Sequence, residues 1–186
     1  MFPISEDIRI YSASAQGAEK EKGSDMEKVL ESMREHRNNG NLAKAKELGK
    51  KLVRVQPDFE SLVSQKYMKP DILYQIKALY VFSAEANLQI FVYDPLLYTT
   101  AINSMYDEIQ KEEEGFYKNI SDGMAYSFYY SEMKKGGDIP LNIGKAFAML
   151  CSAQSSDSFI ETGAELYKKF SEGVEKEIEK ADFKLI

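Results

Sequence analysis

Two side chains in this sequence could act as a base, a nucleophile or a metal ligand: the single histidine, His36, and the single cysteine, Cys151. A thiol nucleophile needs a base within hydrogen-bond reach, so only a fold that brings these two together would activate it. Helical metal sites place a glutamate three residues before the histidine, whereas Met33 occupies that position here. We therefore expect a histidine near a helix C-terminus, where positive charge is favoured, and an inert, buried thiol.

Glycines and acids are the other residues that could bind a phosphate or a cation. The Gly-Gly-Asp segment at 136–138 lacks the Lys-Ser/Thr pair of a phosphate-binding loop, and Pro140 removes a donor amide, so we interpret it as a turn. The acidic run at 112–114 lacks the alternating oxygen ligands of a calcium loop, and we interpret it as a solvated helix end. The sequence therefore predicts no catalytic residue, metal or cofactor, and hence a chain that is not an enzyme.

Four basic side chains share the polar part of a predicted helix and could hold a partner: Lys44, Lys50, Lys51 and Arg54. Residues 24–55 carry eight bases and five acids, whereas residues 105–186 carry ten bases and sixteen acids. Such asymmetry can steer a protein partner or a second copy of the chain, although a solvated surface gives the same pattern. The basic face has no interleaved aromatics and the net charge is −6, which disfavours nucleic acid.

Tyrosine is concentrated in the middle of the chain, where ten of the twelve tyrosines lie between residues 67 and 130. Tyrosine is favoured at binding surfaces because it offers a rigid apolar body with a hydrogen-bonding tip. Tyr126 lies three and four residues before Tyr129 and Tyr130, so these rings can share one helix face. We expect them to be exposed, while Phe128 and Met133 serve the core; the alternative is that the tyrosines form the rim of that core.

These side chains depend on the helices that carry them. Ser24 and Glu27 have the spacing of a capping box that opens a first helix, which would end at residues 38–40. A second helix would follow at once and stop before Pro57, so the pair predicts an antiparallel hairpin. The second helix carries an apolar stripe, and the first four of its members would pack against Val29 and Met33: Leu42, Ala45, Leu48, Leu52 and Val55.

The turn and second helix resemble the second half of a tetratricopeptide repeat, a module that stacks into helical scaffolds. Gly40 at the turn, Leu42 soon after it, the small Ala45 in mid-helix and Pro57 at the end sit at matching spacings. No second copy follows at the family's period of about 34 residues. The resemblance implies helical hairpins stacked in a right-handed array that binds partners, and an irregular helical bundle is the alternative.

The remainder of the chain predicts further helices. Residues 71–92 are apolar nearly all round, which is typical of a helix buried on most sides. Asp94 with Pro95 opens a helix that runs to about residue 114, and Ser121 and Ser158 are expected to open two later ones. Between those two, residues 140–151 predict a short apolar helix. No segment alternates between apolar and polar residues with period two, so the chain is predicted to be all-α.

Residues 1–23 are polar and rich in small residues, and we expect a flexible tail followed by one all-helical domain over residues 24–186. The longest uncharged stretch, residues 95–106, is too short for a membrane span of roughly 20 apolar residues. The chain has one cysteine, and acids where a signal peptide needs bases. The sequence therefore predicts a cytoplasmic protein with no membrane partner.

The sequence thus favours a non-enzymatic helical interaction module that binds a peptide, a protein partner or its own copy. The alternative is a helical small-ligand sensor with an apolar pocket between the helices of residues 71–92 and 94–114. An open groove lined by tyrosines would favour the first, and a closed apolar pocket would favour the second. The expected partner contacts are Tyr126, Tyr129, Tyr130, Lys44, Lys50, Lys51 and Arg54.

Overall fold

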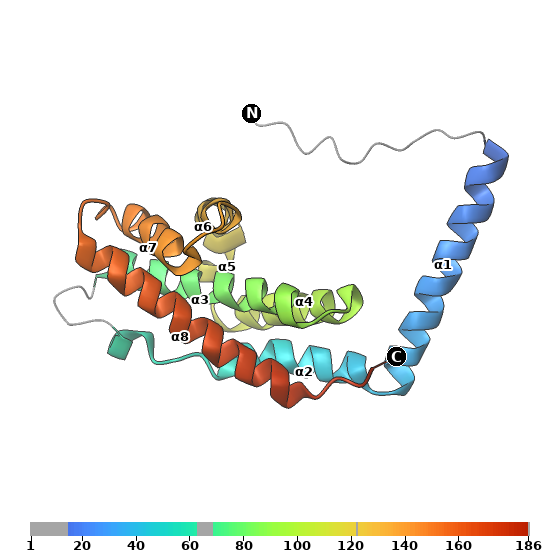
Figure 1. Ribbon diagram of the computed structural model, residues 1–186. Helices are drawn as coiled ribbons and strands as arrows, with labels where there is room; N and C mark the ends of the chain where they lie inside the picture. The colour runs from blue at the N-terminus through green and yellow to red at the C-terminus, as the bar shows by residue number, and fades with distance from the viewer. Residues whose placement is uncertain (1–14, 63–68, 122, 186) are drawn as a thin grey trace. The chain divides into compact units, whose positions relative to one another are not determined.

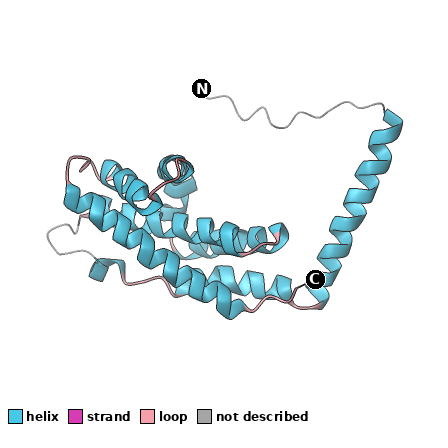
Figure 2. Ribbon diagram, viewed as in Figure 1, coloured by secondary structure: helices cyan, strands magenta, loops and turns pink. Residues whose placement is uncertain are grey.

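The computed structural model describes residues 15–185 except for residues 63–68 and 122. These residues form eight α-helices and one short 3-10 helix, and no strand is found among them (Figure 2). The all-α prediction is therefore confirmed. Within the same residues, no helix combines the length and the apolar character that crossing a membrane requires.

The described chain divides into two units after Gly40, whereas the sequence predicted one domain from residue 24. The first unit contains α1 (Ala15–Asn38), which begins nine residues before Ser24, so Ser24 lies inside a helix and not at its start. Residues 1–14 of the expected tail lie outside the described residues. Val29 and Met33 are 59% and 39% exposed, so neither provides the buried partner surface that the hairpin prediction required.

The second unit, Asn41–Leu185, is a bundle built around one apolar helix. That helix is α3, which packs on α4, α6 and α8 because it carries apolar side chains nearly all round. Pro70 begins it, since a proline lacks only an amide that the first turn leaves unpaired. The elements of this unit are α2 (Asn41–Arg54), η1 (Phe59–Leu62), α3 (Pro70–Phe91), α4 (Pro95–Glu112), α5 (Glu114–Ser121), α6 (Met124–Lys134), α7 (Ile139–Leu150) and α8 (Asp157–Ala181).

Helix α2 packs mainly on α4 and also on α8 (Figure 1). Ala45, Leu48 and Leu52 are buried as the apolar stripe predicts, but the helices that cover them are these two. The predicted packing against Val29 and Met33 is therefore wrong. A helical stripe identifies which face is buried, and it carries no information about which distant helix covers that face.

Helices α7 and α8 form the second extensive helix pair (Figure 1). Two glycines allow the close approach, because a Cβ at Gly144 would lie 2.2 Å from the Ile160 carbonyl oxygen and one at Gly163 would lie 2.7 Å from Phe147 Cβ. The residue before α8 is Ser156, so Ser158 lies inside the helix and its predicted capping role is wrong.

Local signals explain most helix starts between α3 and α7. The Asp94 carboxylate accepts hydrogen bonds from the amides of Leu96 and Leu97, which confirms the predicted cap of α4. After α4 the chain forms α5, a helix that the sequence did not predict. Ser121 ends α5 and does not cap the next helix; Gly123, at φ 74°, supplies the left-handed residue before α6.

Candidate functional site

The structure separates the three tyrosines that the sequence predicted to be exposed on α6. Tyr129 is fully buried and packs against Phe82, with ring centroids 5.2 Å apart and ring planes tilted by 33°, so its predicted exposure is wrong. Its neighbour Phe128, which was expected in the core, is 40% exposed. Tyr126 and Tyr130 do share a face, with their rings stacked 6.4 Å apart. Met133, the other residue expected in the core, does pack against it. The inward face of α6 therefore carries Tyr129 and Met133 instead of Phe128 and Met133.

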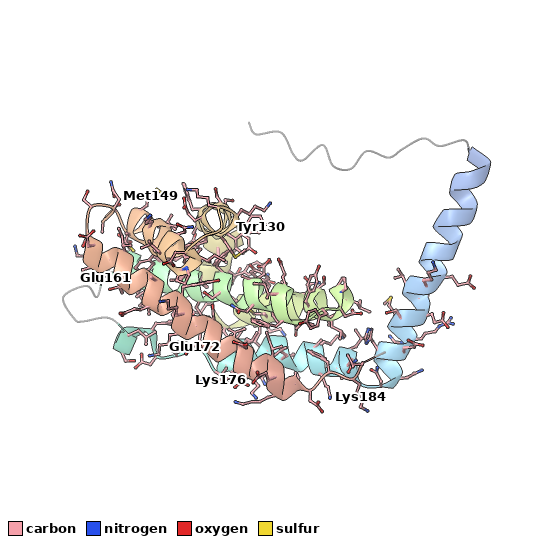
Figure 3. The ribbon with its side chains drawn as sticks, in the orientation of Figure 1. Tyr130, Met149, Glu161, Glu172, Lys176 and Lys184 are labelled. Carbon is pink, nitrogen blue, oxygen red and sulfur yellow. The ribbon has the colours of Figure 1, made fainter. Side chains whose placement is uncertain are left out.

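Tyr126 and Tyr130 form a partly exposed aromatic pair beside the half-buried carboxylate of Glu85. The Lys134 ammonium lies 4.6 Å above the Tyr130 ring, which Figure 3 labels on α6. Burial, and then the charge of Glu85, raises the pKa of Tyr126. Tyr106 donates a hydrogen bond of 2.9 Å to Glu85 Oε2, and burial raises the pKa of that phenol too. Both phenols therefore remain protonated hydrogen-bond donors at neutral pH.

The predicted basic face of α2 splits between two neighbouring helices. Arg54 faces α4, where its Nη2 lies 2.9 Å from Glu108 Oε1. Lys51 faces α8, with Nζ 2.6 Å from Glu177 Oε2, and Lys44 Nζ donates to the main-chain oxygen of Asp182 near the end of that helix. The four basic residues therefore do not form one continuous surface, and Lys44 and Lys51 belong to the boundary between α2 and α8.

A groove of about 270 Å³ lies at this boundary, between the end of α2 and the C-terminal half of α8. A second hollow of about 280 Å³ shares Glu177 and Lys180 with it and continues along α2 to Lys44. We refer to the two together as the α2–α8 groove. The first hollow has an apolar floor and a rim of lysines. Its lining residues are Leu52, Val55, Pro57, Tyr80, Lys169, Phe170, Gly173, Lys176, Glu177 and Lys180.

The floor of the groove is held by aromatic packing and by a buried hydrogen bond. Tyr80 and Phe170 meet edge to face at 5.3 Å between ring centroids, and Phe59 contacts both rings from η1. The Tyr80 hydroxyl donates to the Leu52 carbonyl at 2.6 Å, which occupies an oxygen in the last turn of α2. Because α2, α3, α8 and η1 all contribute, the floor is fixed by the bundle itself.

The ends of the two helices are fixed by contacts that span almost the whole unit. The Asn41 side-chain amide donates to the Lys184 carbonyl at 2.7 Å, and Lys184 N donates back to Asn41 Oδ1 at 2.9 Å. Figure 3 labels Lys184 just beyond the end of α8. Asn41 is fully buried, so both hydrogen bonds are shielded from water. The start of α2 therefore holds the segment that follows α8.

One acid binds two lysines inside the groove. Glu177 Oε1 accepts a hydrogen bond from Lys180 Nζ and Glu177 Oε2 forms an ion pair with Lys51 Nζ, both at 2.6 Å, and the Glu177 side chain is only 12% exposed. The bonds from Lys180 and then Lys51 lower the pKa of Glu177, so it is ionised at neutral pH. Glu177 thus neutralises part of the lysine charge, while Lys169 and Lys176 make no ion pair with the described residues.

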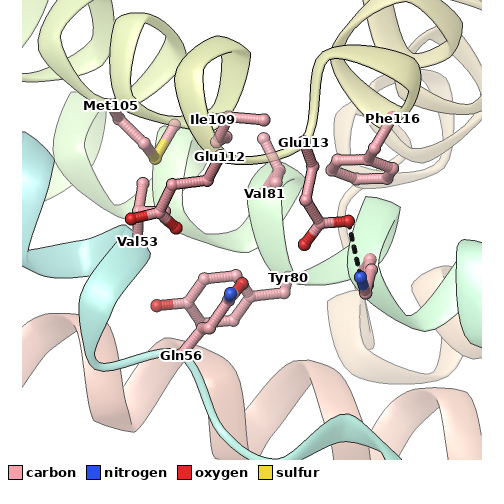
Figure 4. A pocket seen from close by; sticks show the side chains of 10 residues that line it. Val53, Gln56, Tyr80, Val81, Met105, Ile109, Glu112, Glu113 and Phe116 are labelled. Atoms are coloured by element: carbon pink, nitrogen blue, oxygen red, sulfur yellow. Dashed lines mark hydrogen bonds and ion pairs between the residues drawn. The ribbon is translucent and has the colours of Figure 1, made fainter.

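The predicted pocket between α3 and α4 is a small cavity that α2 and α5 also line (Figure 4). Its volume is about 10 Å³, which suits roughly one water molecule. Val81, Met105 and Ile109 give it apolar walls, and the Lys77 ammonium lies 2.7 Å from Glu113 Oε2 at its edge. In this conformation the cavity has no room for a ligand of more than a few atoms.

Neither of the two residues that could do chemistry lines the groove. His36 is buried in the last turn of α1, and no cluster of three metal-ligating side chains exists among the described residues. Burial raises the pKa of the Cys151 thiol to about 12, so it is protonated at neutral pH and a poor nucleophile. Gly136 and Gly137 have φ of 69° and 71° and form the predicted turn before α7.

Most groove residues were absent from the predicted site, and four of them follow one another along α8: Lys169, Gly173, Lys176 and Lys180. Their spacing of four, three and four residues places them on one side of a helix, and this pattern could have revealed them. Comparisons of the chain with protein-family models, with curated proteins and with solved structures find no match in any of the three. The tetratricopeptide resemblance therefore stays a prediction that rests on the residues quoted for it.

Proposed function

We propose that this chain is a non-enzymatic interaction module that binds a protein or peptide segment in the α2–α8 groove. The observation that carries the proposal is a pre-formed apolar floor, built by Tyr80 and Phe170, beside a rim of lysines. Binding sites combine apolar area with a few placed polar groups, and a floor that needs no reordering lowers the entropic cost of binding.

Exposed apolar side chains at the groove support the same function. Val55 was expected inside the apolar stripe of α2, yet it is 46% exposed, and it lines the groove beside Pro57. A single exposed apolar residue is ordinary on a protein surface. Here the exposed residues adjoin a concave surface and charged groups, which is the arrangement of an interface core with its polar rim.

Two further elements of the proposal have weaker support. Tyr126 and Tyr130 offer a second, smaller aromatic surface, and their part in partner binding stays a prediction. A cytoplasmic location also stays a prediction, which rests on the use of one cysteine in the chain. The small-ligand sensor is the weaker alternative, because ligand pockets are usually some 300–1,000 Å³ and the cavity between α3 and α4 would have to open greatly.

Selection of peptides from a random displayed library tests the proposal even though the natural partner is unidentified. Peptides retained by the wild-type protein would be rescreened against Val55→Gln, which removes an apolar contact from the groove. The matched control is Ile90→Gln, because Ile90 is an equally exposed apolar residue, at 53%, that lies outside the groove lining. Both changes are at the surface, so neither should alter stability by more than about 0.5 kcal/mol.

The proposal expects a set of peptides that binds the wild type and Ile90→Gln alike and binds Val55→Gln at least about tenfold more weakly, or some 1.4 kcal/mol. A selection in which every retained peptide tolerates Val55→Gln would contradict the proposed site. Retention of the chain's own segments would identify a second copy as the partner.

A further inference from the structure

Gly173 is an exposed glycine in the middle of α8, and no contact with the described residues accounts for it. A Cβ built at this position meets no atom within 4 Å. Glycine weakens a helix interior relative to alanine, because it loses more conformational freedom on folding. Neither an unusual backbone angle nor close packing within the chain therefore requires glycine here.

Other glycines within helices of this bundle show what such a residue can do. A Cβ at Gly49 of α2 would lie 2.1 Å from the Ala101 carbonyl oxygen of α4. A Cβ at Gly144 of α7 would lie 2.2 Å from the Ile160 carbonyl oxygen of α8. In both places, the missing side chain lets the backbone of a second helix come into contact. Gly173 offers the same kind of surface, and it lines the α2–α8 groove with no helix upon it.

The lysines around Gly173 indicate the charge of a segment that could bind in the groove. Lys169 precedes it by one turn and Lys176 follows by one turn, and both are exposed and lack ion-pair partners among the described residues. Of the two acids that line the groove, Glu177 already binds two lysines, and Glu47 pairs with Arg54. Glu172 is exposed beside the rim and is not part of the lining (Figure 3). The groove is therefore locally basic on a chain of net charge −6.

We propose that the occupant of the groove is an acidic helical segment of another protein, whose backbone packs against Gly173 and whose carboxylates pair with Lys169 and Lys176. This inference rests on the proposed interaction function and adds the class of partner and the residue that sets the distance of approach. The apolar floor would receive the apolar side of that segment, as α4 receives the apolar stripe of α2.

The probe for this inference is a fluorescein-labelled helical peptide of about five turns, with glutamates and leucines on one face. Its control is the same peptide with lysine in place of every glutamate. Fluorescence anisotropy should show binding of the acidic peptide only, with an affinity that falls as salt is added, because exposed charges are screened. Equal binding of both peptides, or no binding of the acidic one, would overturn the inference.

The Gly173→Ala variant separates binding from folding. Because the new methyl group meets nothing in the free protein, the melting temperature should rise by about 2–4 °C. The same methyl group would hold a bound helix away, and affinity for the acidic peptide should fall about tenfold or more. A variant that is more stable and yet binds more weakly cannot be explained by damage to the fold. Unchanged affinity in Gly173→Ala would overturn the close approach.

Charge reversal at Lys176 has a matched control on the same helix. Lys168 is exposed and absent from the groove lining, so Lys168→Glu changes the net charge by the same amount elsewhere. Lys176→Glu should lower the affinity for the acidic peptide at least tenfold, and Lys168→Glu should lower it less than threefold. A factor of ten in affinity corresponds to about 1.4 kcal/mol of binding free energy. Equal losses of affinity in the two variants would mean that the peptide is attracted by net charge alone, and would contradict the proposed binding site.

The two proposals can fail separately. If library peptides depend on Val55 but are not acidic and tolerate Gly173→Ala, the groove is a binding site and the inference about its partner is wrong. If no retained peptide depends on Val55, the proposed function itself is contradicted.

Discussion

Gly49 and Ala101 bring α2 and α4 into backbone contact, since a Cβ at position 49 would lie 2.1 Å from the Ala101 carbonyl oxygen. The same imaginary atom would lie 2.9 Å from the Met105 amide nitrogen. The contact is also supported from the side, where the Ser104 hydroxyl donates to the Lys46 carbonyl at 2.9 Å. The position of α2, which forms one wall of the groove, therefore requires that residue 49 has no side chain.

The Gly49→Ala variant should therefore be less stable, although alanine is the better helix former. The two helices must separate to admit the methyl group, and overpacking of this kind costs about 1–3 kcal/mol. Chemical denaturation would measure the loss. Gly173→Ala is the matched control, because the same change at an open position should raise stability by about 0.5–1 kcal/mol. Equal effects at the two sites would contradict the close approach of α2 to α4.

Two buried tyrosines should respond in opposite ways to loss of the hydroxyl group. The Tyr129 hydroxyl is buried and has no hydrogen-bond partner among the described residues, so Tyr129→Phe should leave stability unchanged or raise it by up to about 1 kcal/mol. The Tyr80 hydroxyl donates to the Leu52 carbonyl, so Tyr80→Phe should cost about 1–2 kcal/mol. Thermal unfolding of both variants checks the pair. A large loss in Tyr129→Phe would mean that its hydroxyl has a partner.

The contribution of Glu177 to the free energy of unfolding should be lost in acid. The lysines lower the pKa of Glu177 below 4.5, so its favourable contribution is complete above about pH 4.5 and is lost as pH falls through the lower, folded-state pKa. Glu177→Gln should thus be less stable than wild type at pH 7, and the difference should shrink towards pH 3. Denaturation curves across this range measure the difference. Glu172→Gln, which removes one exposed negative charge from the same helix, is the control for the loss of charge alone.

Local sequence signals predicted α3 and α4 closely, because each helix begins at a proline. Asp94 with Pro95 identified α4, and the apolar run after Pro70 identified α3 within a residue at each end. The charged run from Glu112 hid α5, because Glu113 interrupts the helix for only one residue before the chain turns into the next. Such an interruption depends on how α5 packs on the bundle, and no local pattern encodes it.

The site was predicted only in part, for reasons of distance along the chain. Lys44 and Lys51 were identified on α2, but their wall of the groove is completed by α8, more than a hundred residues later. Tyr129 was assigned to the surface because it lies three residues after Tyr126 and can share its helix face, and hydrophobicity alone does not decide whether Phe128 or Tyr129 turns inward. Long-range packing decided both cases.

The central claim is that partners bind in the α2–α8 groove, and a map of amide chemical shifts tests it most directly. The isotopically labelled protein would be titrated with a peptide retained in the library selection, and shifts would be followed by nuclear magnetic resonance. We expect the largest shift changes at Val55, Gly173 and Lys176. Ile90 and Tyr93 are exposed near the C-terminal end of α3, outside the groove lining, and their shifts should change little. Changes centred on Ile90 and Tyr93, with Gly173 and Lys176 unmoved, would contradict the claim.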